Sequence, residues 1–296
     1  MTRGHPFARA ALIAASALFA IGYPLARAVE SDAGVPTFVA LSSLFCALAF
    51  SAFGRLGARG PAPVPHEKMV MLLCGAVSPG ILYLILSASR MVTPSLASVI
   101  VISNALIVAA AAGALGRKRF TAPQLLALAG GFAGVVWISV ERGVWGGKLM
   151  GVAELLVSAL LIAAITLAVE APLARLGWAK VSQWTFWSGA VCSMAAVLAL
   201  GKFTPPAPGQ MALAAFMGAA SMSVPAALFN MGMSRLGSAD AAAFKLLIPF
   251  FALVYAAVAL GELPSPGSAL AGSLVIASVG FYQYFSARAV AAVQGN

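Results

Sequence analysis

The chain has 296 residues, of which 61% are hydrophobic and 9% are charged, and its mean hydropathy is +0.97. Soluble domains carry roughly 25% charged residues, so this composition excludes an ordinary water-soluble enzyme and favours the lipid bilayer as the solvent. A spanning helix needs about 20 apolar residues. The chain is therefore long enough for about ten spans joined by short loops, with no room for a domain outside the membrane.

Ten apolar segments follow one another along the chain, separated by turns rich in Gly and Pro. We expect helices at residues 8–28, 35–54, 69–89, 93–115, 122–140, 149–169, 183–202, 210–233, 240–260 and 266–287. Arg3 and Arg9, ahead of the apolar run of the first segment, also resemble the start of a signal peptide, but the repeat described below requires that segment as a helix. The pattern predicts an all-α integral membrane protein of the bacterial inner membrane, surrounded by lipid.

The net charge of +10 reports on orientation, because lysine and arginine accumulate in the cytoplasmic loops of membrane proteins. With the N-terminus in the cytoplasm, the cytoplasmic side receives Arg3, Arg9, Arg55, Arg59, Lys68, Arg117, Lys118, Arg119, Arg175, Lys180, Arg235 and Arg288. The other side receives only Arg27, Arg90, Arg142, Lys148 and Lys202. This bias predicts that both termini are cytoplasmic, and it leaves no support for nucleic acid as a partner.

An internal repeat appears when the sequence is shifted by 145 residues, which places 89–116 over 234–261 without a gap. Both stretches open with Ser-Arg and close with Gly before a turn. Each half contains five segments, an odd number, so the second half enters the membrane inverted. We predict two inverted five-helix repeats, 1–145 and 146–296, an architecture typical of alternating-access transporters with a substrate site near the midplane. One chain holding both repeats makes a monomer sufficient and leaves a dimer open.

Several motifs resemble the EamA-type transporters of the drug/metabolite transporter superfamily. They are residues 227–237 (ALFNMGMSRLG), 247–249 (LIP), 261–262 (GE) and 271–276 (AGSLVI) with Gly280. In the first half, Ala105, Arg117 and the pair Ser43-Leu44 stand where the family has Pro, Glu and Arg-Phe. The resemblance implies ten helices and secondary transport, by export, of small polar or amphipathic metabolites such as amino acids. It leaves the substrate itself open.

Glu154 and Lys245 are charged residues that fall inside predicted spans. Glu154 lies about 7–8 Å from the outer end of its helix, where a charge is costly unless it faces a cavity or a partner. We interpret it as the candidate for proton coupling or for binding a substrate amine, the alternative being a carboxylate that reaches the interface. Lys245 either contacts substrate or extends its ammonium group towards the interface. If substrate or water connects Glu154 to Lys245, the site offers one negative and one positive charge, which would suit a zwitterionic substrate.

Other polar residues within the spans complete the candidate site. Asn104 is the repeat mate of Pro249, a residue that leaves a backbone carbonyl without its helical partner. Asn230 matches a family position, with a helix–helix hydrogen bond as its simpler role. Three tyrosines are expected to line the cavity because buried hydroxyls need partners: Tyr23, Tyr83 and Tyr255. Aromatic residues at segment ends are expected at the membrane interface: Trp184, Phe186, Trp187, Tyr282 and Tyr284.

Three alternatives stand beside an alternating-access exporter. An importer of a vitamin or nucleotide precursor would use the same fold, a passive channel would lack saturation, and an intramembrane enzyme would need catalytic groups. His5 and His66 lie outside the segments, so neither a metal site nor a cofactor is expected. Paired acid–base chemistry lacks its residues, and we predict that the chain is not an enzyme.

Overall fold

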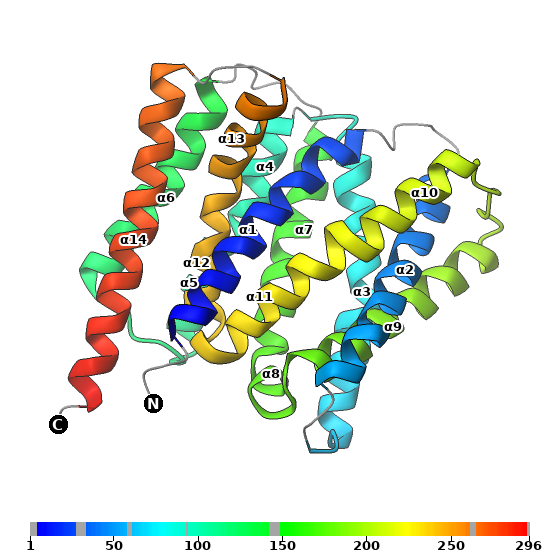
Figure 1. Cartoon of the computed structure of the whole chain (residues 1–296), viewed down its shortest axis with the longest axis horizontal. Helices are drawn as coiled ribbons and strands as arrows, with labels where there is room; N and C mark the ends of the chain where they lie inside the picture. Colours follow the sequence, from blue (N-terminus) through cyan, green and yellow to red (C-terminus); the bar gives the residue numbers. More distant parts are fainter. Residues whose placement is uncertain are drawn as a thin grey trace.

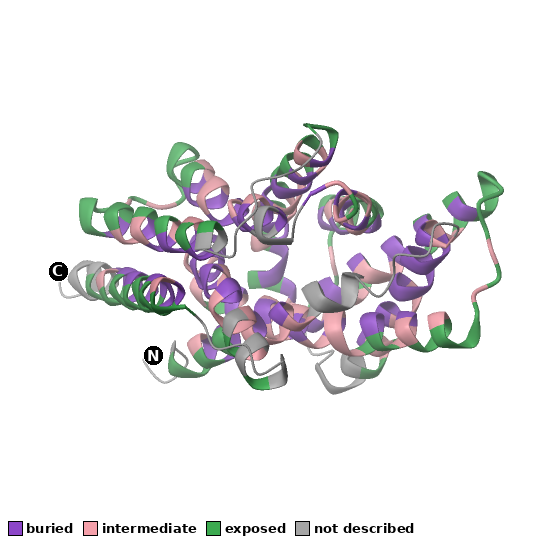
Figure 2. Cartoon of the chain, turned by 90° about the horizontal axis from the view of Figure 1, so that it is seen from above, coloured by how far each residue is buried: buried purple, intermediate pink, exposed green. Residues whose placement is uncertain are grey.

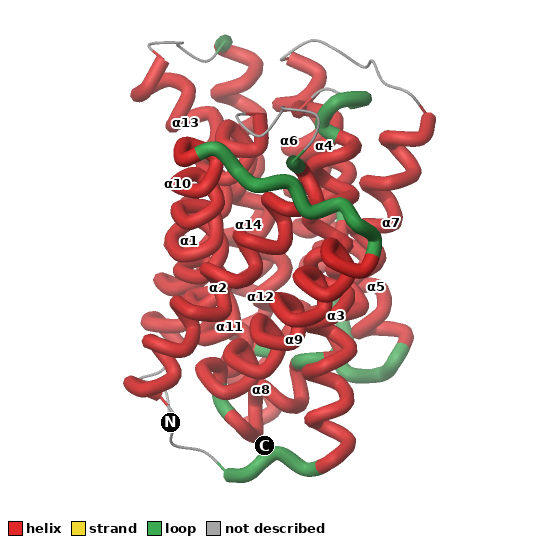
Figure 3. Tube along the Cα trace, turned by 90° about the vertical axis from the view of Figure 1, so that its right-hand side faces the viewer, coloured by secondary structure: helices red, strands yellow, loops and turns green. Residues whose placement is uncertain are grey.

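The computed structural model describes residues 5–27, 34–57, 61–92, 94–141, 149–260 and 265–294. These residues form helices and turns, with no β-strand among the elements of the described ranges. The helices lie side by side in one bundle, with the connecting loops at its two ends (Figures 1 and 3). The start of α1 (His5–Arg27) and the end of α14 (Pro266–Gln294) lie at the same end of the bundle, which we call the terminal end.

Each predicted segment coincides with one helix or with successive helices. The first half forms α1, α2 (Val35–Gly57), α3 (Pro65–Ala88), α4 (Pro94–Ile102), α5 (Asn104–Ala114) and α6 (Ala122–Glu141). The second half forms α7 (Leu149–Ala168), α8 (Glu170–Leu176), α9 (Trp178–Ala199), α10 (Pro208–Phe216), the π-helical turn η2 (Met217–Met222), α11 (Ser223–Leu236), α12 (Ser238–Phe244), the 3₁₀ turn η3 (Lys245–Leu247), α13 (Ile248–Leu260) and α14. The expected boundary between the repeats, at residue 145, lies outside the described residues.

Length and hydropathy identify helical stretches that suffice to cross a bilayer. Within the described chain these are Val35–Ala52, Pro65–Ala88, Leu149–Leu176, Pro208–Leu236 and Pro266–Arg288. The other predicted spans are shorter, interrupted or less apolar. Large apolar side chains such as Leu126, Leu149 and Val258 are 74–84% exposed, and exposed residues face outward around the bundle (Figure 2). The all-α membrane fold is confirmed.

Glycines bring neighbouring helices into close contact. A Cβ atom at Gly75 of α3 would overlap the carbonyl oxygen of Thr185 on α9 and lie 2.8 Å from the Cβ of Ser188. A Cβ at Gly189 of α9 would lie 2.9 Å from the carbonyl oxygen of Gly75. In membranes, where water does not drive helices together, such small residues allow the close backbone approach that gives van der Waals packing.

Two spans are interrupted at matching places in the two repeats. Ser103 separates α4 from α5, and the turn η3 separates α12 from α13. The shift of 145 residues places Asn104, at the start of α5, over Pro249, in the first turn of α13. The two spans run in opposite directions along the bundle (Figure 1), as expected for inverted repeats.

The interruption in the second repeat has a local chemical cause and a remote hydrogen-bond partner. Pro249 has no N–H group and cannot bond the carbonyl of Lys245 as a helix requires. The hydroxyl of Ser16 on α1 lies 2.8 Å from the carbonyl oxygen of Phe244, the last residue of α12, and 2.9 Å from that of Leu12. The hydroxyl of Tyr255 donates to the carbonyl oxygen of Ala17 at 3.0 Å. Helix α1 therefore supports α12 and α13 on either side of the break.

Several aromatic residues expected at the membrane interface contact other parts of the bundle. Phe186 stacks on Phe50 of α2 with ring centroids 4.6 Å apart. The indole N–H of Trp187 donates to the hydroxyl of Ser51 at 2.7 Å. Tyr282 is 1% exposed. Each of these side chains contacts another part of the bundle, which the sequence of its own helix does not reveal, and its depth in the membrane stays a prediction.

We predict that substitution of Gly75 by Ala destabilises the protein by about 1–3 kcal/mol, because the added methyl group forces α3 and α9 apart. Gly80 on the same helix is the matched control, since nothing lies within 4 Å of a Cβ added there. Gly80→Ala should be neutral or slightly stabilising. Unfolding in mixed micelles measures both variants, and equal stabilities would contradict the close packing.

We predict that Ser16→Ala lowers the free energy of unfolding by about 0.5–1.5 kcal/mol, because it removes the hydrogen bond that ties α1 to the carbonyl of Phe244. The matched control is Ser273→Ala on α14, whose hydroxyl bonds only within its own helix, to Ala269, at an exposed position. We expect the control to stay within about 0.5 kcal/mol of the wild type. A Ser16 variant as stable as this control would show that the break does not depend on α1.

Candidate functional site

Lys245 occupies the interruption between α12 and α13, in the interior of the ninth predicted span. Its ammonium nitrogen donates to Oδ1 of Asn104 at 3.3 Å and lies 4.5 Å from the centre of the Phe229 ring on α11. Phe19 of α1 packs edge-on against Phe229 with centroids 6.5 Å apart. Among the described residues, the ion pairs do not include Lys245, so its charge is met by an amide oxygen and an aromatic face.

Asn104 joins the two interrupted spans. Its side chain is buried, with 2% exposed, and its amide N–H donates to the carbonyl oxygen of Val101. That carbonyl lies in the last turn of α4, where the helix stops and a backbone acceptor would otherwise lack its donor. The Asn104 side chain thus compensates the break in the first repeat and positions an oxygen for Lys245 of the second.

Glu154 lies on α7, beside the end of α3. The hydroxyl of Ser87 donates to its Oε1 at 3.3 Å. Its other oxygen, Oε2, is buried and has no hydrogen-bond partner among the described residues. Glu154 contacts α3, whereas Lys245 contacts α5 and α11. The structure therefore does not bring the two charges into contact.

The other predicted site residues are distributed over the bundle. The amide of Asn230 donates to the hydroxyl of Ser182 at 2.8 Å and links α11 to α9. Tyr255 is bonded to α1, as described above. Tyr83 lies on an exposed face of α3 with 44% of its surface accessible. Tyr23 belongs to α1, but its side chain lies outside the description.

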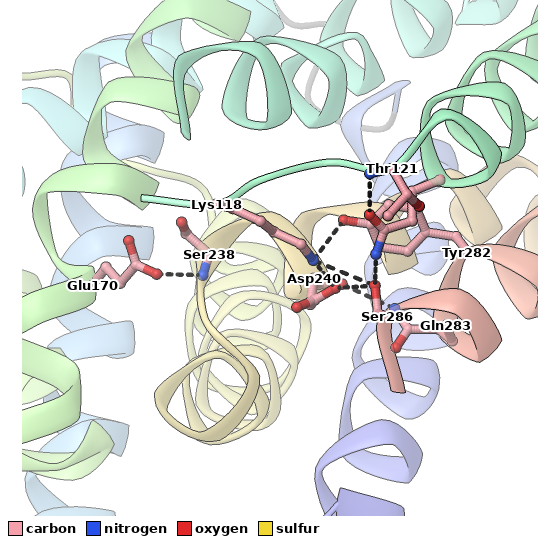
Figure 4. A network of polar contacts seen from close by, with 9 residues as sticks. Lys118, Thr121, Glu170, Ser238, Asp240, Tyr282, Gln283 and Ser286 are labelled. Carbon is pink, nitrogen blue, oxygen red and sulfur yellow. Dashed lines mark hydrogen bonds and ion pairs between the residues drawn. The ribbon is translucent and has the colours of Figure 1, made fainter. Parts of the chain in front are cut away.

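A polar cluster at the terminal end was not predicted as a functional feature. Lys118, in the turn between α5 and α6, donates to Asp240 at 2.5 Å, to the hydroxyl of Tyr282 at 3.1 Å and to that of Ser286 at 3.3 Å (Figure 4). In the sequence the basic run at 117–119 indicated only orientation. Its proximity to Asp240 could have been suspected because both residues border spans at the same end of the bundle.

A groove of about 580 Å³ lies between α3 and α9. Leu72, Val191 and Cys192 on its wall are exposed residues, so the groove opens on the outer surface of the bundle. It does not contain Lys245 or Asn104. Among the described residues, no group of three or more His, Cys, Asp or Glu side chains could hold a metal ion.

Comparison with solved structures shows the same fold. A protein of known crystal structure superposes with a TM-score of 0.74, covering 95% of this chain and 99% of the other at 16% sequence identity. A curated relative from Streptantibioticus cattleyicolor is 27% identical over 276 residues, which is 91% of each chain, and is described as a probable terminal-alkyne amino-acid exporter.

A family comparison covers both halves of the sequence. The EamA-like transporter family matches at residues 7–140 and again at 149–283. Together with the relative, this match points to a metabolite transporter and not to an enzyme. The predicted resemblance is therefore confirmed, and the chain belongs to the EamA-like transporter family.

Proposed function

We propose that this protein is a secondary active transporter that exports small polar or amphipathic metabolites, namely amino acids or related compounds, by alternating access. The curated relative supports the substrate class and the direction. The two interrupted spans support the mechanism, because broken helices that meet within the bundle typically form the substrate site of transporters built from inverted repeats.

The observation that carries the proposal is the ammonium group of Lys245. An ammonium offers three donors, of which one is used by Asn104, and no carboxylate of the described chain pairs with it. A charge inside a membrane is costly and typically marks a substrate or ion pathway. A carboxylate on the substrate would supply the missing countercharge and accept the free donors.

The backbone around Lys245 suits a zwitterion. Helices α5 and α13 both begin at the interruptions, whereas α4 and α12 both end there. Helix N-termini favour negative charge and C-termini favour positive charge. The carboxylate of an amino acid would be placed at Lys245 and the helix N-termini, and its ammonium group near the C-terminal carbonyls. The rings of Phe229 and Phe19 would pack on the apolar part of the substrate.

Orientation belongs to the same proposal. The start of α1 and the end of α14 lie at the terminal end (Figure 3), and the distribution of lysine and arginine in the sequence favours a cytoplasmic position for that end in a bacterium. Export would then load substrate from the terminal end. The partners are a small-molecule substrate and the lipid of the inner membrane, and one chain suffices for the cycle.

We predict that Lys245→Met raises the KM for amino-acid counterflow about ten- to a hundredfold, because a charge-assisted hydrogen bond of about 1.5–3 kcal/mol is lost. Lys245→Arg should retain part of the affinity. The control is Lys202→Met, at an exposed position near the other end of the bundle. Proteoliposomes with a labelled panel of amino acids, vitamins and nucleosides provide the measurement. Unchanged KM values in the Met variant would refute the role of Lys245.

The same assay separates the alternatives. Large, non-saturating flux without counterflow would indicate a channel. Saturable transport of vitamins or nucleosides, but not of amino acids, would favour the importer. Everted vesicles test export, and right-side-out vesicles test import.

We further propose Glu154 as the proton-coupling residue, because its partly buried carboxyl group has one oxygen without a partner and can bind a proton there without breaking an ion pair. We predict that Glu154→Gln abolishes accumulation driven by a proton gradient and leaves counterflow intact. Glu154→Asp, which retains the carboxyl group, should keep part of the coupling. Protonophore-sensitive uptake into everted vesicles is the measurement, and gradient-driven accumulation by the Gln variant at the wild-type level would exclude this role.

A further inference from the structure

The ammonium group of Lys118 has a partner for each of its donors. They are Asp240 on α12 and the hydroxyls of Tyr282 and Ser286 on α14. Ser286 also donates to Asp240 at 2.9 Å, and the ring of Tyr282 lies 5.0 Å from the ammonium nitrogen. The side chains of Lys118 and Asp240 are each only 19% exposed. This enclosure distinguishes the pair from ordinary surface salt bridges, which contribute little.

A second contact starts from the same turn. Arg117 pairs with Glu170 of α8 at 3.4 Å, and the other oxygen of Glu170 accepts the backbone N–H of Ser238, at the start of α12, at 2.8 Å (Figure 4). Adjacent residues of the first half thus hold two carboxylates of the second half. The Arg117 pair is the more exposed one, at 46% and 28% for its side chains.

Short helices connect this cluster to the candidate substrate site. Asp240 and Lys245 lie at the two ends of α12, five residues or about 7–8 Å apart along a helix. Helix α5 begins at Asn104 and ends shortly before Lys118, and it packs against α12. Two contacts therefore connect α5, or the turn that follows it, to α12, or the turn that follows it. Lys245–Asn104 lies in the interior of the bundle, and Lys118–Asp240 lies at the terminal end.

The bundle does not need this ion pair to hold α6 and α14 together. Those helices already pack closely through Gly130, Gly131 and Gly134, where added Cβ atoms would lie 2.7–3.0 Å from side chains of α14 and η3. Helices α5 and α12 also pack on each other, and their buried residues include Ala109, Ala112 and Ala242 beside the larger Val108 and Phe244.

We propose that Lys118 and Asp240 form a latch that holds α5 against α12 and closes the terminal end of the transport passage. The latch opens once in each cycle, when the site at Lys245 becomes reachable from the terminal end. This inference rests on the alternating-access mechanism proposed above. Substrate bound between Lys245 and Asn104 would act on the latch through α5 and α12, because each helix carries one residue of the site at one end and borders the latch at the other.

The test is the access of a thiol reagent to the substrate site. Cys46, Cys74 and Cys192 are replaced, and Phe19→Cys supplies a single reporter beside Phe229. A membrane-impermeant maleimide is applied to vesicles whose terminal end faces the medium. We expect Lys118→Met and Asp240→Asn each to raise the labelling rate at least tenfold. Arg117→Ala should change it less than threefold, because its ion pair is exposed. The charge swap Lys118→Asp with Asp240→Lys should return the rate towards that of the intact latch.

Arg288→Ala is the matched control, because it removes an exposed positive charge from the same end of the bundle. The described contact of Arg288 is with the ring of Tyr284 on its own helix. Its labelling rate should equal that of the intact latch. Asp240→Asn is nearly isosteric, so it can be used alone to test the latch if the Lys118 variant does not give monodisperse protein. Wild-type labelling rates in Asp240→Asn would overturn the latch.

The labelling experiment needs no substrate, so it tests the latch independently of the proposed transport function. Normal counterflow with unchanged labelling in the latch variants would leave the transporter and remove the latch. Faster labelling in the same variants would support the latch even if Lys245→Met transported normally.

Discussion

Inside a bilayer a peptide group has no water to bond with, so a helix that stops there must find another partner for each polar group it releases. In the first interrupted span, the side chain of Asn104 bonds the carbonyl of Val101. In the second, the carbonyl of Lys245, which Pro249 leaves without its helical donor, accepts the backbone N–H of Ile248, and the neighbouring carbonyl of Phe244 accepts the hydroxyl of Ser16 from α1. The same arrangement in space is therefore reached with different chemistry, a proline in one repeat and an asparagine in the other. The position of Lys245 depends on it, because the lysine occupies the gap that Pro249 creates.

The polar groups of the described chain are arranged in two ways. At the terminal end, Arg175 pairs with Glu67, Arg117 with Glu170 and Lys118 with Asp240, so that loops and short helices are held across the bundle. In the interior, Lys245 has only an amide and an aromatic ring, and Glu154 has a single hydroxyl. Interior groups that are incompletely paired are costly for stability. Their presence is readily explained if a substrate or a proton completes them for part of the cycle.

Hydropathy and the repeat were sufficient to predict the all-α membrane fold and the approximate ends of the helices, and they aligned residues 104 and 249, which lie at the two interruptions. A membrane span produces a hydropathy signal over about 20 consecutive residues, so it can be detected from a local stretch of sequence. The π-helical turn η2 and the short helix α8 were missed because each is too short to produce a hydropathy signal of its own. The Lys118–Asp240 pair joins residues 122 positions apart. No local pattern encodes such a pairing, and the same holds for Ser16 with Phe244.

The inverted repeat gives a reason why the site and the latch share the same helices. Each interrupted span divides into a half-helix on either side of the midplane, and the halves at the terminal end are α5 and α12. These two helices pack on each other, and α6 packs on α14. A movement that separates α5 from α12 must break the contacts at both of their ends. In the proposed cycle, the rigidity of these two helices would couple occupation of the site at one end to release of the ion pair at the other, without a longer chain of contacts through the bundle.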